Sequence, residues 1–168
     1  MAIESVLRDI NLFVDGRGYA GKVMEFTLPK LTVKTEEYRA GGMDAPVELD
    51  MGLEKLECDF SLDSVARDAL RLWGLAQGEQ PALTFRGAVQ GRDGTIQAVV
   101  VRTRGQIKEV DYGSWKPGEK ATLKFMAAVD YYKLEIDGET IHEIDIENYT
   151  RIVNGVDQVA ARRAALGL

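Results

Sequence analysis

The chain has 168 residues, of which 45% are hydrophobic and 29% charged. This composition is typical of a folded globular protein and unlike that of disordered chains, and the length suits a single domain over residues 1–168. The formal net charge of −6 argues against specific nucleic-acid binding, which needs a basic surface. No apolar run approaches the ~20 residues that cross a bilayer. We therefore expect no stable membrane insertion, and we expect the chain to be made in the cytoplasm.

Three glycines near the start, Gly16, Gly18 and Gly21, have the spacing of a dinucleotide-binding fingerprint and follow the strand-like sequence INLFV. That fingerprint needs a helix directly after the glycines, because the helix N-terminus holds the pyrophosphate. Here the alternating sequence of residues 23–28 follows instead. We therefore expect a turn between strands at these glycines.

Period-two alternation begins at residues 23–28, where Met24, Phe26 and Leu28 alternate with Glu25 and Thr27. This is the pattern of a strand with one dry and one wet face. Pro29 cannot donate to a strand ladder and predicts a kink or bulge, after which residues 31–38 resume an extended pattern.

Residues 40–52 fit neither the helix nor the strand period. The segment begins with Gly41 and Gly42 and contains a proline. Its apolar residues have no evident internal core to enter; they are Met43, Val47, Leu49 and Met51. Long loops are often mobile, whereas a series of exposed apolar residues usually awaits a partner. The segment is thus either a mobile loop or a docking arm.

The clearest strand signal covers residues 55–62. Its apolar set is Leu56, Cys58, Phe60 and Leu62, and its polar set is Lys55, Glu57, Asp59 and Ser61. Cys58 is the single cysteine of the chain, so no intrachain disulfide can form. Its place in the apolar set predicts a buried, inert thiol.

An amphipathic helix is expected over residues 65–73, after a capping Asp63 or Ser64 and before Gly74. One face of this helix should cover a sheet, and it comprises Val65, Ala66, Ala69, Leu70 and Trp73. A second, short helix is expected over the Ala-rich residues 159–166, which end at Gly167.

Two β-hairpins complete the predicted elements. Residues 82–90 and 95–104 flank a loop that contains Asp93-Gly94, and residues 120–136 and 139–145 flank Asp137-Gly138. With the earlier segments this gives six or more strands and little helix. The sequence therefore predicts a mainly β fold.

Residues that could support catalysis or metal binding are sparse. His142 is the single histidine, it lies in an alternating strand, and such a residue is usually at the surface. With one cysteine and one histidine a soft-metal site lacks ligands. The carboxylates of residues 137–147 lack the EF-hand spacing and are better explained as a solvated acidic face. We expect no cofactor, no metal and no enzymatic activity.

Several separate blocks, in the same order, resemble the major tail tube proteins of contractile-tailed phages. These blocks are residues 28–31 (LPKL), 38–43 (YRAGGM), 108–111 (KEVD), 136–139 (IDGE) and 153–157 (VNGVD), with Arg162-Arg163 and Gly167-Leu168 at the end. The resemblance covers nearly the whole chain, which is also similar to the inner tube protein of R-type pyocins. Type VI secretion tubes, which use a related fold, are the alternative.

The resemblance implies two packed antiparallel sheets with one flanking helix, a β-sandwich or partial barrel whose strands contribute to a large barrel across a hexameric ring. Stacked rings would form the channel of a tail or bacteriocin particle, driven through a target envelope by a contracting sheath. The implied partners are other copies of the chain, sheath protein, baseplate and tape-measure proteins. The subunit would be made in the bacterial cytoplasm and assembled into a virion tail or a released extracellular particle.

Two groups of site residues follow. An extended loop bridges rings in the family, which favours the docking-arm interpretation of residues 40–52, with inter-ring contacts at Gly41, Gly42, Met43, Val47, Leu49 and Met51. In a closed barrel one face of each strand points to the channel. The lumen candidates are Glu25, Thr27, Glu57, Asp59 and Ser61. Alternation reveals two faces of a strand but not which one lines a channel, so bulk solvent remains the alternative for these side chains.

Overall fold

The computed structural model describes residues 5–168, which form a mainly β fold with two short helices. The strands are β1 (Ser5–Val14), β2 (Arg17–Gly18), β3 (Val23–Thr27), β4 (Val33–Tyr38), β5 (Val47–Leu53), β6 (Leu56–Leu62), β7 (Ala82–Gly91), β8 (Ile96–Asp111), β9 (Leu123–Ile136), β10 (Glu139–Asp145), β11 (Thr150–Val153) and β12 (Val156–Asp157). The helices are α1 (Arg67–Leu70) and α2 (Ala160–Ala165). Both predicted hairpins are confirmed, as β7–β8 and β9–β10.

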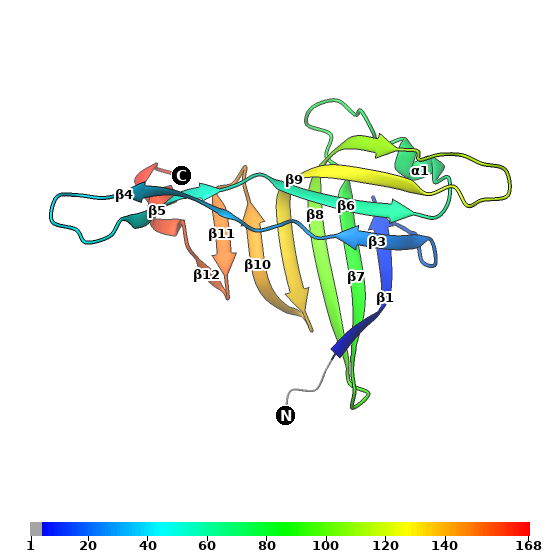
Figure 1. Cartoon of the computed structure of the whole chain (residues 1–168), viewed down its shortest axis with the longest axis horizontal. Helices are drawn as coiled ribbons and strands as arrows, with labels where there is room; N and C mark the ends of the chain where they lie inside the picture. Colours follow the sequence, from blue (N-terminus) through cyan, green and yellow to red (C-terminus); the bar gives the residue numbers. More distant parts are fainter. Residues whose placement is uncertain (1–4) are drawn as a thin grey trace.

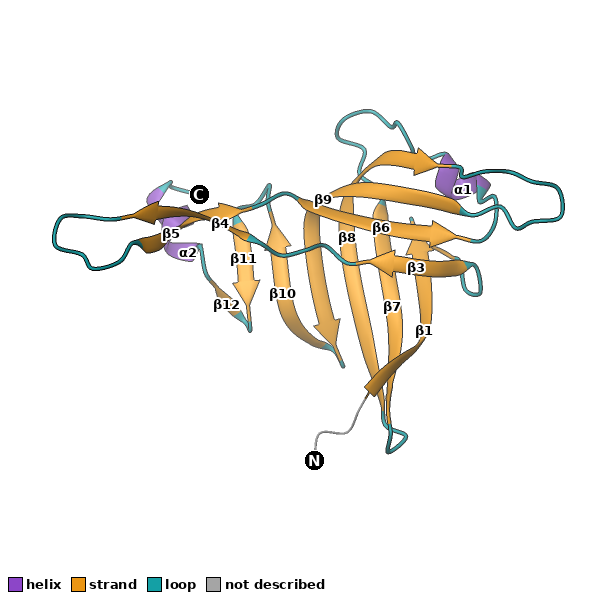
Figure 2. Ribbon diagram, viewed as in Figure 1, coloured by secondary structure: helices purple, strands orange, loops and turns teal. Residues whose placement is uncertain are grey.

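The strands form two antiparallel sheets. The larger has ten strands, and β4 and β5 form a separate two-stranded sheet. The large sheet folds into two layers that run crosswise (Figures 1 and 2). One layer, which we call the outer layer, contains β1, β7, β10, β11 and the paired residues 96–104 of β8 and 131–136 of β9. The other, which we call the wall layer, has the order β3-β6-β9-β8 and uses residues 123–129 of β9 and 105–111 of β8.

The long strands β8 and β9 turn from one layer into the other. The register between them shifts between Arg104 and Gly105, and again between Ile107 and Glu109. A side chain at Gly105 would overlap the backbone oxygen of Ala128 on the paired strand. Glycine is therefore required here by the close approach of two backbones rather than by a left-handed conformation. Bulges of this kind bend a sheet, and this bend creates the sandwich.

The core lies between the two layers. Phe60 and Phe125 stack with ring centroids 4.8 Å apart, and Phe26 stacks on Phe85 of the outer layer at 4.6 Å. All four apolar positions predicted for residues 55–62 are buried. Cys58 is among them, which confirms the buried thiol, and desolvation raises its pKa to about 12. This thiol is protonated and unreactive at neutral pH.

The first helix is shorter than expected, and this corrects the predicted covering face. Ala66, Ala69 and Leu70 pack on the core, but Val65 precedes α1 and is exposed. Trp73 lies beyond the end of α1 and is 55% exposed. It leaves the helix because its backbone forms a bridge with Ile107 at the edge of β8, while its indole N–H donates to the Lys108 carbonyl at 3.1 Å.

The predicted cap of the first helix was wrong, since α1 begins after Ala66, with no side-chain cap from Asp63 or Ser64. The turn at the glycine motif and the second helix are confirmed. Asp15 and Gly16 turn with positive φ between β1 and β2, and no helix follows the glycine motif. The Ala-rich segment forms α2. Across residues 5–168, none of the helices combines the length and apolar character needed to span a bilayer.

Candidate functional site

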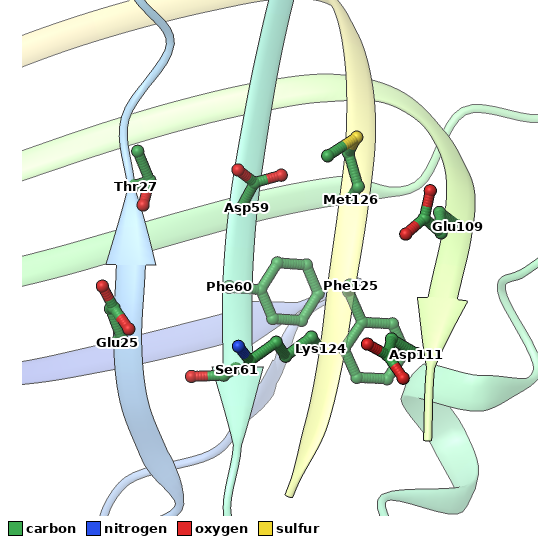
Figure 3. Close-up of a pocket in the computed structure, with 10 residues that line it drawn as sticks. All are labelled: Glu25, Thr27, Asp59, Phe60, Ser61, Glu109, Asp111, Lys124, Phe125 and Met126. Atoms are coloured by element: carbon green, nitrogen blue, oxygen red, sulfur yellow. The ribbon is translucent and has the colours of Figure 1, made fainter. Parts of the chain in front are cut away.

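The polar face of the wall layer gathers most of the predicted lumen candidates. Across β3 and β6, Glu25 pairs with Ser61 and Thr27 pairs with Asp59. These four residues line one cavity of about 270 Å³, shown in Figure 3. Because a strand alternates its side chains, Phe26 and Phe60 between them must point to the core. The alternation predicted from sequence thus places these polar groups together on one surface.

Two further carboxylates reach the same surface from β8. Glu109 pairs with Met126 and Asp111 with Lys124 of β9, and all four line the cavity with the β3 and β6 residues. Sequence reasoning missed Glu109 and Asp111. The signal that could have found them is the alternation around the partly buried Val110, which the bulge in β8 obscures.

The fifth lumen candidate, Glu57, lies on the same face of β6 but outside this cavity. Its carboxylate forms ion pairs with Lys108 and, at 2.9 Å, with Lys55. The ammonium group of Lys108 contributes most, and together they hold the pKa of Glu57 below its ordinary value. Lys124 lies on the same surface. The wall surface therefore carries charges of both signs, with more carboxylates than ammonium groups. Ser61 is 6% exposed, so it adds little surface.

Residues 40–52, the second predicted group, do not form a continuous loop. They are the turn and most of the second strand of a hairpin. Tyr38 pairs with Val47 and Glu36 with Leu49, so β4 and β5 form a two-stranded ribbon around the turn at residues 39–46. We call residues 33–53 the arm. It projects from one end of the molecule (Figure 1). The expectation of an irregular segment was wrong because its strand partner, β4, lies outside the segment.

The apolar face of the arm is directed away from the body of the protein. Tyr38, Val47, Leu49 and Met51 are all exposed. On the other face of β5, Asp50 accepts a hydrogen bond of 2.8 Å from Arg151 of β11. Gly52, with φ of 100°, shifts the alternation, so that Leu53 returns toward α2. A two-stranded ribbon usually buries its apolar face; here that face is open to solvent.

The tip of the arm is closed on itself. The backbone N–H of Ala40 donates to the sulfur of Met43, and the Met43 carbonyl accepts from Arg39. Met43 is therefore half-buried, while Gly41 and Gly42 are exposed. Of the six predicted contact residues, Val47, Leu49 and Met51 share one exposed face, and Met43 is turned inward.

Outside these two surfaces, little in the structure suggests chemistry. His142 is half-buried rather than at the surface, and its Nδ1 is buried without a hydrogen-bond partner among the described residues. The tight packing of β10 between β9 and β11 explains this burial. Within residues 5–168, no three His, Cys, Asp or Glu side chains converge in the manner of metal ligands.

The described residues form a two-layered sandwich with a polar wall surface and a projecting arm, and comparison with known proteins gives its class. The family described as phage tail tube protein FII matches residues 4–167. The tail tube protein of Escherichia phage P2 is 36% identical over 172 residues, covering 100% of both chains. The major tail tube protein of Serratia phage KSP20 is 35% identical over 151 residues, covering 89% of this chain and 87% of its own.

Solved structures share the fold at low sequence identity. A chain of the sheath/tube terminator of the extracellular contractile injection system PVC has a TM-score of 0.58 at 12% identity, covering 76% of this chain and 93% of its own. A chain of the PVC sheath-tube complex has a TM-score of 0.57 at 12% identity, covering 76% and 88%. A chain of the anti-feeding prophage baseplate gives 0.56 at 9% identity, covering 80% and 97%.

The chain belongs to the phage tail tube protein family. It is a structural tail tube subunit, and the resemblance drawn from the sequence blocks is confirmed. The type VI alternative receives no support, since the matched family and both relatives are phage tail proteins.

Proposed function

We propose that the chain assembles as stacked hexameric rings, in which the wall layer lines a central channel. The observation that supports this most directly is the wall layer itself. Its core face carries stacked phenylalanines, its other face is polar, and β3 pairs with no strand except β6 among the described residues. An edge strand of this kind is an aggregation hazard in a monomer and a joint in a polymer.

The strand directions favour closure between copies. In the order β3-β6-β9-β8 each neighbouring pair is antiparallel. A layer of four alternating strands ends with β8 running opposite to β3. If residues 109–111 of β8 in one copy pair with β3 of the next, the antiparallel alternation therefore continues across the joint. Repetition around a ring forms a barrel without free edges, in which backbone hydrogen bonds are satisfied.

The polar surface then lines the channel. Four carboxylates surround the cavity in Figure 3, namely Glu25, Asp59, Glu109 and Asp111, and Lys124 is the one cation in its lining. A narrow passage with an acidic excess repels phosphates and keeps a moving polyanion from adhering to the wall. This suits a conduit for DNA in a phage, or for ions in a bacteriocin particle, without specific nucleic-acid binding.

The arm supports the stacking of rings. It projects along the long axis of the molecule with an exposed apolar face (Figure 1), and such a face is stabilised when a partner removes it from water. We assign Gly41, Gly42, Met43, Val47, Leu49 and Met51 to inter-ring contacts, with Val47, Leu49 and Met51 as the anchoring side chains.

The remaining partners follow from the family. A contractile sheath around the tube, a baseplate at its end and a tape-measure protein within it complete the assembly, in a virion tail or an extracellular bacteriocin particle. The subunit is made in the bacterial cytoplasm as a single domain and acts mechanically, without catalysis. The structural neighbours include chains of a sheath-tube complex and of a baseplate, which supports these assignments.

Electron microscopy of the purified chain over a range of concentrations tests the proposal. We expect rings and long tubes with a central channel, and class averages of end views with six-fold symmetry. A protein that stays monomeric at every concentration, or that forms only closed dimers, would contradict it.

A further inference from the structure

An apolar groove lies beside β3, where the outer layer extends past the wall layer. Its floor and sides are formed by Leu7, Val89 and Val99 of the outer layer and by Met24 and Leu28 of the segment containing β3, around a cavity of about 440 Å³. Gly87 lies beneath the Leu7 side chain, since a Cβ there would come within 2.9 Å of Leu7 Cδ1.

The groove is open because the wall layer ends at β3. The strands β1 and β7 and the first part of β8 continue beyond β3, and among residues 5–168 no further strand lies across them (Figure 1). Leu7 and Met24 are more than half exposed as a consequence. Leu7, which pairs with Val89 across β1 and β7, is a core-facing position of a sandwich that lacks its next strand, rather than an isolated surface residue. Met24 lies at the bulge between Val23 and Glu25, at the rim of the groove.

An exposed indole, that of Trp73, lies at the β8 edge of the wall layer, opposite the β3 edge. Trp73 is 55% exposed, although its backbone is fixed by the bridge with Ile107 and its N–H by the Lys108 carbonyl. The single polar atom of the ring already has a partner. The exposed part is therefore apolar, held in one orientation, and costs little entropy to bury.

We propose that Trp73 of one copy fills the groove beside β3 of the neighbouring copy in the ring. This inference rests on the proposed ring closure, in which residues 109–111 of β8 pair with β3 of the next copy. Such pairing brings the two strands to about 4.8 Å. It therefore brings the indole, which lies at the β8 edge, and the groove, which lies at the β3 edge, to the same joint.

A Trp73 side chain that fills this groove must come from another copy. Within one chain, β6 and β9 separate β3 from β8, a distance of about 14 Å at the usual strand spacing, so Trp73 cannot reach its own groove. A ring also requires a heterologous interface, in which two different surfaces of the same subunit complement each other. The indole and the groove are two such surfaces, and Trp is among the residues enriched at interface hot spots.

Two tryptophan variants test the role of the indole. Trp73→Ala should leave the monomer folded by circular dichroism but raise the concentration needed for assembly at least about tenfold, the effect expected of an interface anchor. Trp115→Ala is the matched control, because Trp115 is 63% exposed and lies on the loop between β8 and β9. It should leave that concentration within about twofold of the natural value. Normal assembly of Trp73→Ala would overturn the proposal.

A second pair of variants tests the groove. Val89→Asp places a charge in the groove and should impair assembly as strongly as Trp73→Ala. Thr84→Asp changes the opposite face of the same strand, where Thr84 pairs with Arg102, and should assemble normally. Thermal unfolding of each monomer shows whether a variant has simply lost its fold. If Val89→Asp is folded and assembles normally, the groove does not receive the indole.

Fluorescence reports the contact directly and separates it from the proposed function. In a Trp115→Phe background, Trp73 is the only tryptophan, and its emission should shift to shorter wavelength when monomers form tubes, because the ring leaves water. The shift should be absent from folded Val89→Asp monomers at the same concentration. Tubes that form without the shift would overturn this inference and leave the proposed function intact. Failure of the natural chain to form rings or tubes would overturn both.

Discussion

Arg151 of β11 donates a hydrogen bond of 2.8 Å to Asp50 of β5, and this ion pair joins the arm to the body of the protein. It attaches the polar face of the hairpin and leaves the apolar face with Leu49 and Met51 in solvent. The arm is thus held to the body by this ion pair and by Leu53 at its base, while its apolar face is left without a partner in the monomer.

The attachment of the arm should depend on pH. The backbone N–H of Gly52, followed by the Arg151 guanidinium, lowers the pKa of Asp50 below its ordinary value of 3.8. A lowered pKa means that the contribution is complete above the ordinary value and is lost as pH falls through the lower, folded value. We expect amide order parameters of the arm, measured by NMR, to fall in that acidic range. Asp50→Asn should remove the dependence and Glu48→Gln should retain it; a pH-independent arm in the natural chain would contradict this prediction.

The apolar face of the arm should matter for tubes and not for folding. Replacing Val47 and Leu49 by serine removes side chains that are already exposed, so the free energy of unfolding of the monomer should change by less than about 1 kcal/mol. Tube length in electron micrographs should fall to single rings or short stacks. Glu48→Ser, on the opposite face of β5, is the control and should give long tubes. Long tubes from the double variant would show that the apolar face of the arm does not make the contact between rings.

Gly105 should not tolerate a side chain. A Cβ at this position meets the backbone oxygen of Ala128, and backbone cannot yield as a flexible side chain can. Gly105→Ala should therefore destabilise the monomer by about 3 kcal/mol or more, the upper end of the range for overpacking. Gly41→Ala, which has open space and no left-handed φ, should be near neutral. Denaturant unfolding of both variants provides the comparison, and equal stabilities would mean that the bend in β8 can relax.

The sign of charge on the wall surface should govern retention of DNA. Glu25→Lys with Asp59→Lys reverses two charges beside Lys124, so assembled tubes should retain short DNA fragments at low salt and release them at high salt. Natural tubes should retain little at either ionic strength. Glu139→Lys with Glu147→Lys, at the start of β10 and just after its end, makes the same change in total charge away from the wall layer and is the control. If the control retains as much DNA as the double variant, Glu25 and Asp59 do not face the channel.

The local parts of the fold could be predicted from the sequence. Alternation in residues 55–62 depends only on which side chains share a face, and β6 has the predicted buried and polar sets. The Asp-Gly turn at Asp137-Gly138 requires positive φ at both residues, which the structure has. Four of the lumen candidates come together because Glu25 and Asp59 keep the period-two pattern on neighbouring strands.

The errors arise where distant segments compete with local preference. Helical periodicity assigned Trp73 to the core, but its backbone bridges to Ile107 of β8 and its indole to Lys108, residues more than thirty positions away. The arm is a different case, because Tyr38 and Val47 are only nine positions apart. There the glycine pair and the proline of the turn masked the extended pattern of β5.

The continuity of β8 and β9 through both layers has a mechanical consequence. Each strand passes from the outer layer to the wall layer without a loop, across the bend at Gly105. A load applied to the outer layer is therefore carried to the wall layer by covalent backbone. The hydrogen bonds between β8, β9 and their neighbouring strands resist sliding in both layers. No hinge separates the two layers along these strands, so a tube built from such subunits should transmit an axial thrust as a stiff rod instead of dissipating it in internal bending.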